Sequence, residues 1–108
     1  MQIRVNGGEN VRATEALGTS VSAYLERELA RFAHQITRVE VHMSDENAEK
    51  GGADHKRCTV EARVEGRPPY VVTEHSATMR QAMVGATEKL YRLIEHDLGR
   101  LHDRSPPA

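Results

Sequence analysis

Apolar residues recur at steps of three, four or seven along the last third of the chain, which predicts one long amphipathic helix over residues 78–104. Thr78 is a typical N-cap with Gln81 placed to complete a capping box, and Pro106 and Pro107 end the helix. These apolar residues form a stripe along one side of the predicted helix, and this stripe needs a flat apolar surface to pack against. Its members are Met79, Met83, Ala86, Leu90, Ile94, Leu98 and Leu101.

A shorter helix is predicted after Thr14, which can cap it, with Glu15 placed favourably in the first turn. We expect this helix to end near His34. Its apolar positions are Leu17, Val21, Leu25, Leu29 and Phe32.

Four segments instead show the alternation of strands. Residues 44–54 between the second and third strands are polar and predict a long hairpin loop, and Pro68 and Pro69 before the last strand suit an edge position. The predicted strands are residues 2–5, 37–43, 56–65 and 70–73. The inward positions are Ile3, Val5, Val39, Val41, Met43, Cys58, Val60, Ala62 and Val64.

The predicted fold is therefore α+β, with two layers in the order β-α-β-β-β-α. The first two strands form a parallel unit with a right-handed crossover, and the rest is an antiparallel meander. Both helices must cover one face of the four-stranded mixed sheet, because each strand has a single apolar face. A chain of 108 residues holds one such domain, expected over residues 1–104 with a disordered tail at 105–108.

Composition restricts the function classes. Fifteen Lys and Arg against sixteen Asp and Glu require that any nucleic-acid binding come from a local patch. Only four aromatic residues are present, which argues against a stacking platform for bases. The single cysteine, Cys58, is predicted to be a buried apolar residue, consistent with a reducing, cytoplasmic protein that has no signal peptide or membrane span.

Cations on the flank of each predicted helix are the strongest functional signal. A row of positive charge beside a packing face suits phosphate contact. The residues alone nevertheless favour solvated charges, with Glu88 and Glu95 spaced to pair with Arg92. The long helix carries Lys89, Arg92, His96 and Arg100 within roughly 80° of one another, at about 100° per residue. Arg27, Arg31 and His34 share a face of the first helix.

No catalytic or cofactor motif stands out, so we expect a binding protein without enzymatic activity, metal or cofactor. The six histidines lack metal-ligand spacing. The segment that begins at Asp45 starts like a calcium loop, but Lys50 and Lys56 replace the required glycine and glutamate, and we expect no calcium site there. A small hydrolase or metal protein using His42, His55 or His75 is a distant alternative.

Three motifs resemble the ribosome hibernation factors, the hibernation-promoting factor and ribosome-associated inhibitor family, also called sigma-54 modulation proteins. They are the opening Met-Gln-Ile-x-Val-x-Gly, the segment Ala13-Thr14-Glu15-Ala16-Leu17, and Met79-x-x-Ala82-Met83-x-x-Ala86-x-x-Lys89-Leu90. Their order and spacing match from Met1 to about Arg104. The chain resembles the short form, without the C-terminal dimerisation domain of longer members.

The resemblance implies a monomeric factor that binds the small ribosomal subunit and the 70S ribosome in the channel for messenger and transfer RNA, silencing translation under stress. It implies no membrane and no small-molecule substrate. Ribosomal RNA contact would fall to Arg27, Arg31, Lys89 and Arg92, and His96 and Arg100 extend the row by geometry alone. Pairing of two copies through the edge strand at Tyr70 stays open.

The chain also departs from the family pattern. Arg80 stands where a tyrosine is usual, and Glu95 where further Arg or Lys is usual. Residues 15–34 hold two Arg against three Glu, and residues 79–104 hold five Lys or Arg against four Asp or Glu. This balance motivates the alternative of a protein-interaction module that has the same fold and does not bind ribosomes.

Overall fold

The expected order of elements is confirmed. The computed structural model describes residues 1–8, 10–46 and 55–103, with side chains at the C-terminal end described as far as Leu98. The predicted tail at 105–108 and most of the predicted loop at 44–54 lie outside these residues. The elements are β1 (Gln2–Gly7), α1 (Glu15–Glu28), the 3₁₀ turn η1 (Ala30–Phe32), β2 (Ile36–Asp45), β3 (Lys56–Val64), β4 (Tyr70–Ser76) and α2 (Met79–Asp103).

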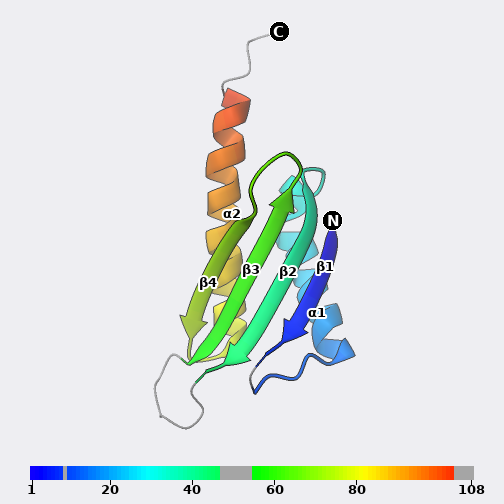
Figure 1. Cartoon of the computed structure of the whole chain (residues 1–108), viewed down its shortest axis with the longest axis vertical. Coiled ribbons are helices and arrows are strands. Elements are labelled where there is room, and N and C mark those ends of the chain that lie inside the picture. Colours follow the sequence, from blue (N-terminus) through cyan, green and yellow to red (C-terminus); the bar gives the residue numbers. More distant parts are fainter. Residues whose placement is uncertain (9, 47–54, 104–108) are drawn as a thin grey trace.

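The four strands form one mixed sheet in the order β1-β2-β3-β4. β1 runs parallel to β2, with Val5 opposite Val41, and the two remaining pairs are antiparallel. Both helices lie behind the same face of the sheet, and α2 continues beyond the end of the strands (Figure 1). The predicted two-layer α+β architecture is therefore correct.

The core lies between the helices and the inward positions of β2 and β3. Val39, Val41 and Val60 are fully buried, as the alternation predicts, and Leu25 of α1 covers them with no exposed surface. The buried row of α2 is Ala82, Ala86, Leu90 and Ile94. Met79 and Met83, which the stripe placed inside, are only partly buried because they lie at the groove between the two helices.

The first helix ends earlier than predicted. α1 stops at Glu28, and Leu29 leaves helical geometry (φ −103°, ψ 12°) before the short turn of η1. A 3₁₀ turn winds more tightly than an α-helix, and such turns are common at helix C-termini. This one brings Phe32 into the core and against the ring of Tyr91, at 5.2 Å between centroids.

Both predicted N-caps form. Thr14 Oγ1 accepts a hydrogen bond from the Leu17 amide, and Thr78 Oγ1 accepts one from the Gln81 amide, each at 3.1 Å. β4 runs three residues further than predicted, because Glu74 and His75 continue the ladder opposite Cys58 and Arg57. Backbone pairing therefore continues through residues whose polar side chains gave no sign of a strand.

Two side-chain links hold α2 to the β4 edge. The Asp97 carboxylate accepts hydrogen bonds from the Tyr70 hydroxyl and, at 2.6 Å, from Arg67. Nearer the middle of the helix, Lys89 donates to Glu74 and to the Thr73 carbonyl. None of the helices in the described residues is both long and apolar enough to span a membrane.

Candidate nucleic-acid interface

The cations predicted from the sequence occupy different surroundings in the structure. α1 and α2 share one face of the sheet, so the end of α1 and the middle of α2 form a common outer surface (Figure 1). Arg31 of η1 crosses this surface, with its Nη1 2.5 Å from Glu95 Oε2 and 3.3 Å from the Tyr91 hydroxyl. These hydrogen bonds raise the pKa of Arg31, and the one to Tyr91 contributes most. Both side chains of the Arg31–Glu95 pair are about half exposed, at 56% and 47%.

Arg27 lies on the same side of the molecule. Its guanidinium carbon is 5.6 Å from the centre of the Tyr24 ring, a distance typical of a cation–π contact. Among the residues that the structure describes, Arg27 has no carboxylate within ion-pair distance. Its charge is therefore open to an outside anion.

Lys89 points away from this surface, toward the edge of the sheet. Its Nζ lies 3.0 Å from Glu74 Oε1 and 3.1 Å from the Thr73 carbonyl. The ammonium group therefore covers a backbone acceptor on an edge strand and neutralises a carboxylate, which blunts the edge. The row predicted on α2 is thus divided, with Lys89 held at the β4 side and Arg92 at the rim of a cleft between α2 and α1.

Arg92 is exposed, and no ion pair involving it occurs in the described part of the chain. The pairing of Arg92 with Glu88 or Glu95 that the spacing suggested does not occur among the described residues, and Glu95 binds Arg31 instead. His96 is exposed and interacts with its neighbours, including Asp97, whose pKa is lowered chiefly by the Tyr70 hydroxyl. Arg100 belongs to α2, but its side chain lies outside the described residues.

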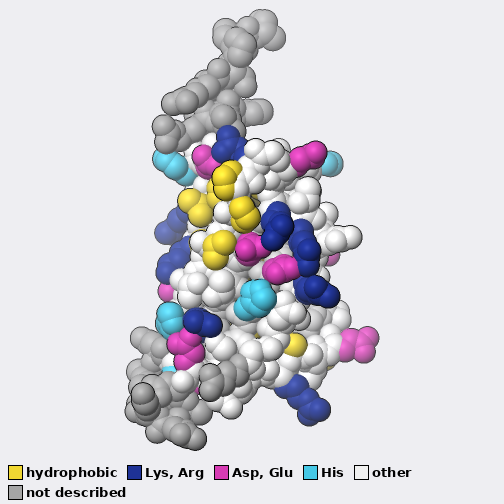
Figure 2. Space-filling model, in the orientation of Figure 1, with side chains coloured by type: hydrophobic (Ala, Val, Ile, Leu, Met, Phe, Trp, Pro, Cys, Tyr) yellow, Lys and Arg dark blue, Asp and Glu magenta, His cyan; other side chains and the backbone are white. Residues whose placement is uncertain are grey.

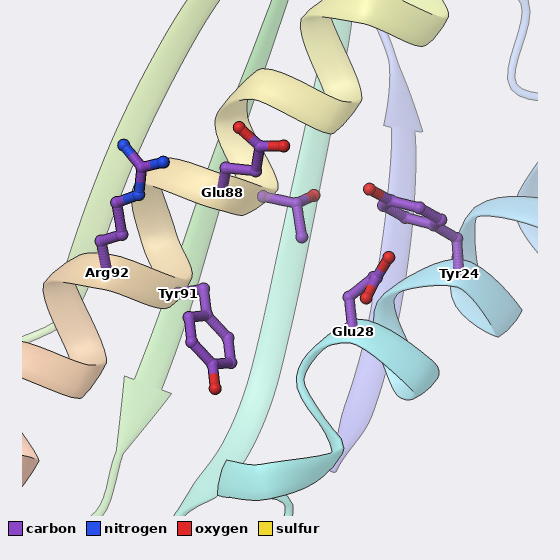
Figure 3. A pocket seen from close by; sticks show the side chains of 6 residues that line it. Tyr24, Glu28, Glu88, Tyr91 and Arg92 are labelled. Carbon is purple, nitrogen blue, oxygen red and sulfur yellow. The ribbon is translucent and has the colours of Figure 1, made fainter.

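Sequence reasoning missed a cleft between the two helices. Figure 3 shows side chains from α1 and α2 facing each other across it. The cleft has a volume of about 380 Å³. It is lined by Tyr24 and Glu28 from α1 and by Thr87, Glu88, Tyr91 and Arg92 from α2. We call these six residues the interhelical cleft.

Three of the four aromatic residues gather at or beside the interhelical cleft. Tyr24 and Tyr91 line it, and Phe32 supports Tyr91 from behind at an interplanar angle of 53°. Burial, followed by the charges of Glu28 and Glu88, raises the pKa of Tyr24. No sequence signal joins Tyr24 to Tyr91, because only the packing of α1 beside α2 brings them together.

The open face of the sheet is mixed in charge. Figure 2 shows basic side chains interleaved with acidic ones over the strands. Two of its ion pairs lie within single strands, since Arg38 pairs with Glu40 and Arg63 with Glu61, two residues apart on one side of a strand. This face therefore presents no continuous basic surface.

The histidines of the distant metal or hydrolase alternative lie against separate carboxylates. His42 faces Glu40 at 3.6 Å, His55 faces Asp45 at 2.6 Å, and His75 faces Glu46 at 3.6 Å. Within residues 1–8, 10–46 and 55–103, no three His, Cys, Asp or Glu side chains are grouped so as to hold a metal ion. Cys58 is buried as predicted, and burial raises the pKa of its thiol to about 11.

Comparisons with known proteins agree with the fold. The family model described as sigma 54 modulation protein / S30EA ribosomal protein matches residues 3–102. The N-terminal domain of Protein Y from Thermus thermophilus is 23% identical, with a TM-score of 0.65 over 89% of this chain and 98% of that one. A ribosomal subunit interface protein from Coxiella burnetii is 16% identical, with a TM-score of 0.68 over 92% and 99%. No curated protein matches the sequence.

Proposed function

The chain belongs to the sigma 54 modulation protein / S30EA ribosomal protein family, and on this premise we propose that it is a ribosome-associated inhibitor of translation. The match over residues 3–102 carries the proposal, since it spans nearly the whole described fold. In this role the protein binds the small ribosomal subunit and occludes the channel for messenger and transfer RNA. Occlusion needs a rigid folded body held in place, with no catalysis and no cofactor.

The side of α2 that faces α1 is the contact surface that the geometry supports best. Arg27 and Arg92 have no ion-pair partner among the described residues, and Arg31 lies between them in an exposed pair with Glu95. Exposed pairs are weak, so a phosphate can replace Glu95 at small cost. His96 and Arg100 continue along α2 beyond these three.

Lys89 is a weaker member of the site than the sequence suggested. To reach a phosphate, its ammonium group must leave both the Glu74 carboxylate and the Thr73 carbonyl. A surface built from about three or four cations gives a shallow salt dependence, with a log–log slope of roughly three to four at most. Shape therefore carries a larger share of binding than charge does.

A second candidate is a protein-interaction module with this fold and no affinity for ribosomes. The ion pairs of Arg31 and Lys89 favour it, because they already neutralise two of the six predicted contact residues. This candidate predicts binding to a protein partner that changes little with salt. Ribosome binding that weakens as salt rises would exclude it.

The test is co-sedimentation of purified protein with small subunits and with whole ribosomes at increasing salt. Arg92→Glu should lower the pelleted fraction several-fold, because it replaces an unpaired cation of the contact surface with an anion. Lys89→Glu, on the β4 side of the same helix, is the matched control and should have the smaller effect. Thermal unfolding of each variant shows whether the fold is intact.

Two outcomes would contradict these assignments. Wild-type protein that stays in the supernatant at low salt would refute ribosome association. Pelleting that Arg92→Glu leaves unchanged, or that falls more with Lys89→Glu, would refute the contact surface while leaving association in place.

A further inference from the structure

We propose that the interhelical cleft binds one unpaired guanine base of an RNA strand. The identity of the polymer rests on the proposed function, since a family member bound to ribosomal RNA would present this surface to it. The preference for guanine rests on the cleft itself. Its volume of about 380 Å³ falls in the range of small-ligand sites, roughly 300 Å³ and above.

Three charged groups at the interhelical cleft have no ion pair among the described residues. Glu40 and Glu61 on the sheet are each paired with an arginine, whereas Glu15, Glu26 and Glu65 elsewhere on the described surface are not paired. Among the described residues, Glu28, Glu88 and Arg92 have no ion pair, although Glu88 and Arg92 stand four positions apart on one helix. Figure 3 shows Tyr24 and Glu28 extending from α1 toward α2, whereas Arg92 extends from the side of α2 that is away from α1. Two acceptors therefore lie at the cleft, and the one donor, Arg92, lies at its rim.

Aromatic rings line the interior of the interhelical cleft, and the hydroxyl of Thr87 already has a hydrogen-bond acceptor within α2. Tyr24 and Tyr91 are half-buried, and Tyr91 is backed by Phe32. The buried Thr87 donates its hydroxyl to the Met83 carbonyl at 2.8 Å, so this hydroxyl needs no partner from an occupant. Rings held by packing on one side can stack an unpaired base, which every nucleobase permits.

The carboxylates decide among the bases. A carboxylate accepts hydrogen bonds only, and its two oxygens suit two neighbouring donors. Guanine offers such a pair in its ring N1–H and its 2-amino group, whereas uracil offers mainly carbonyl acceptors on the same edge. Glu88 would bind that edge, and Arg92, four positions further along α2 at the rim, would hold the adjoining phosphate.

A cationic side chain of a protein is the competing occupant. It would meet Glu28 and Glu88 favourably, and tyrosine rings also attract cations. It would, however, lie beside the unpaired guanidinium of Arg92 and leave that group without a partner. A nucleotide uses a carboxylate through its base and the guanidinium of Arg92 through its phosphate, and we therefore favour it.

Nuclear magnetic resonance titration tests the proposal with two single-stranded pentanucleotides, one with a central guanosine among uridines and one of uridine alone. The guanosine strand should bind about fivefold or more tightly, as expected for a bidentate contact. Its shift changes should centre on Tyr24, Thr87 and Tyr91. Glu88→Gln keeps the size of the side chain and removes its charge, and it should abolish most of this preference.

Glu26→Gln is the matched control. Like Glu88 of α2, Glu26 of α1 is an exposed helical glutamate, but it lines a separate groove beside β1. It should keep the preference for guanosine. Equal binding of the two strands, or shift changes centred away from the interhelical cleft, would overturn the proposal whether or not ribosomes are bound. Shift changes at the cleft with arginine amide, and none with either strand, would overturn it in favour of a cationic partner.

The pelleting assay separates this proposal from the proposed function. If Glu88→Gln loses the guanosine preference and also pellets less with ribosomes, the base site operates in the complex. If wild-type protein binds the guanosine strand and never pellets with ribosomes, the proposed function fails and the polymer must be another RNA. Both results leave the guanine preference of the interhelical cleft standing.

Discussion

The ion pair between Arg31 and Glu95 allows an unusual prediction, in which removing an intramolecular contact strengthens binding. Arg31 lies on the proposed contact surface with its Nη1 2.5 Å from Glu95 Oε2. Whether phosphate replaces Glu95 or approaches Arg31 beside it, the carboxylate opposes binding. Glu95→Gln keeps the side-chain length and removes that opposition.

The structure sets the size of the effect. With side-chain exposures of 56% and 47%, the pair is open to solvent, and the contribution of such pairs corresponds to at most about a fivefold change in an equilibrium constant. We therefore expect Glu95→Gln to bind small ribosomal subunits up to about fivefold more tightly at fixed salt. The unfolding midpoint should stay close to that of the wild type.

Glu74→Gln is the matched control. It removes the same charge and releases Lys89, whose Nζ lies 3.0 Å from Glu74 Oε1 on the β4 side of α2. Both variants gain the same long-range attraction to RNA, so the difference between them reports the local surroundings. The assay is fluorescence anisotropy of N-terminally labelled protein titrated with small subunits. Weaker binding by Glu95→Gln, or an equal or larger gain with Glu74→Gln, would refute the contact surface.

Two further predictions concern stability. Gly18→Ala should raise the free energy of unfolding by about 1 kcal/mol, because a Cβ at Gly18 meets nothing within 4 Å. Gly85→Ala should gain less stability or none, since its Cβ would come within 2.4 Å of Glu74 Oε2. Urea unfolding measures both variants, and equal gains would contradict the packing described at Gly85. Cys58 should resist thiol reagents until the protein unfolds. Burial raises the pKa of its thiol to about 11, above an unfolded value near 8.5. The stability that Cys58 contributes is therefore complete below that unfolded value and is lost as pH rises toward 11. Rapid labelling of native protein at neutral pH would refute this assignment.

The proposed contact surface was only partly predictable from the sequence. The spacing of Lys89 and Arg92 correctly placed both residues on exposed flanks of α2. It could not show that Lys89 is held by Glu74 and the Thr73 carbonyl, because these belong to a strand whose length the pattern underestimated. Glu95 was likewise spaced to pair with Arg92, and the fold pairs it with Arg31 instead.

The sequence by itself determined the order of the elements, the apolar face of each strand and both helix N-caps. These features depend on local spacing, and periods of two and about 3.6 residues can be read along one segment. The tertiary structure decided which charges are paired and that Tyr24 and Tyr91 line one cleft. Those contacts join residues far apart in the chain, and their distances depend on how α1 and α2 settle side by side on the sheet.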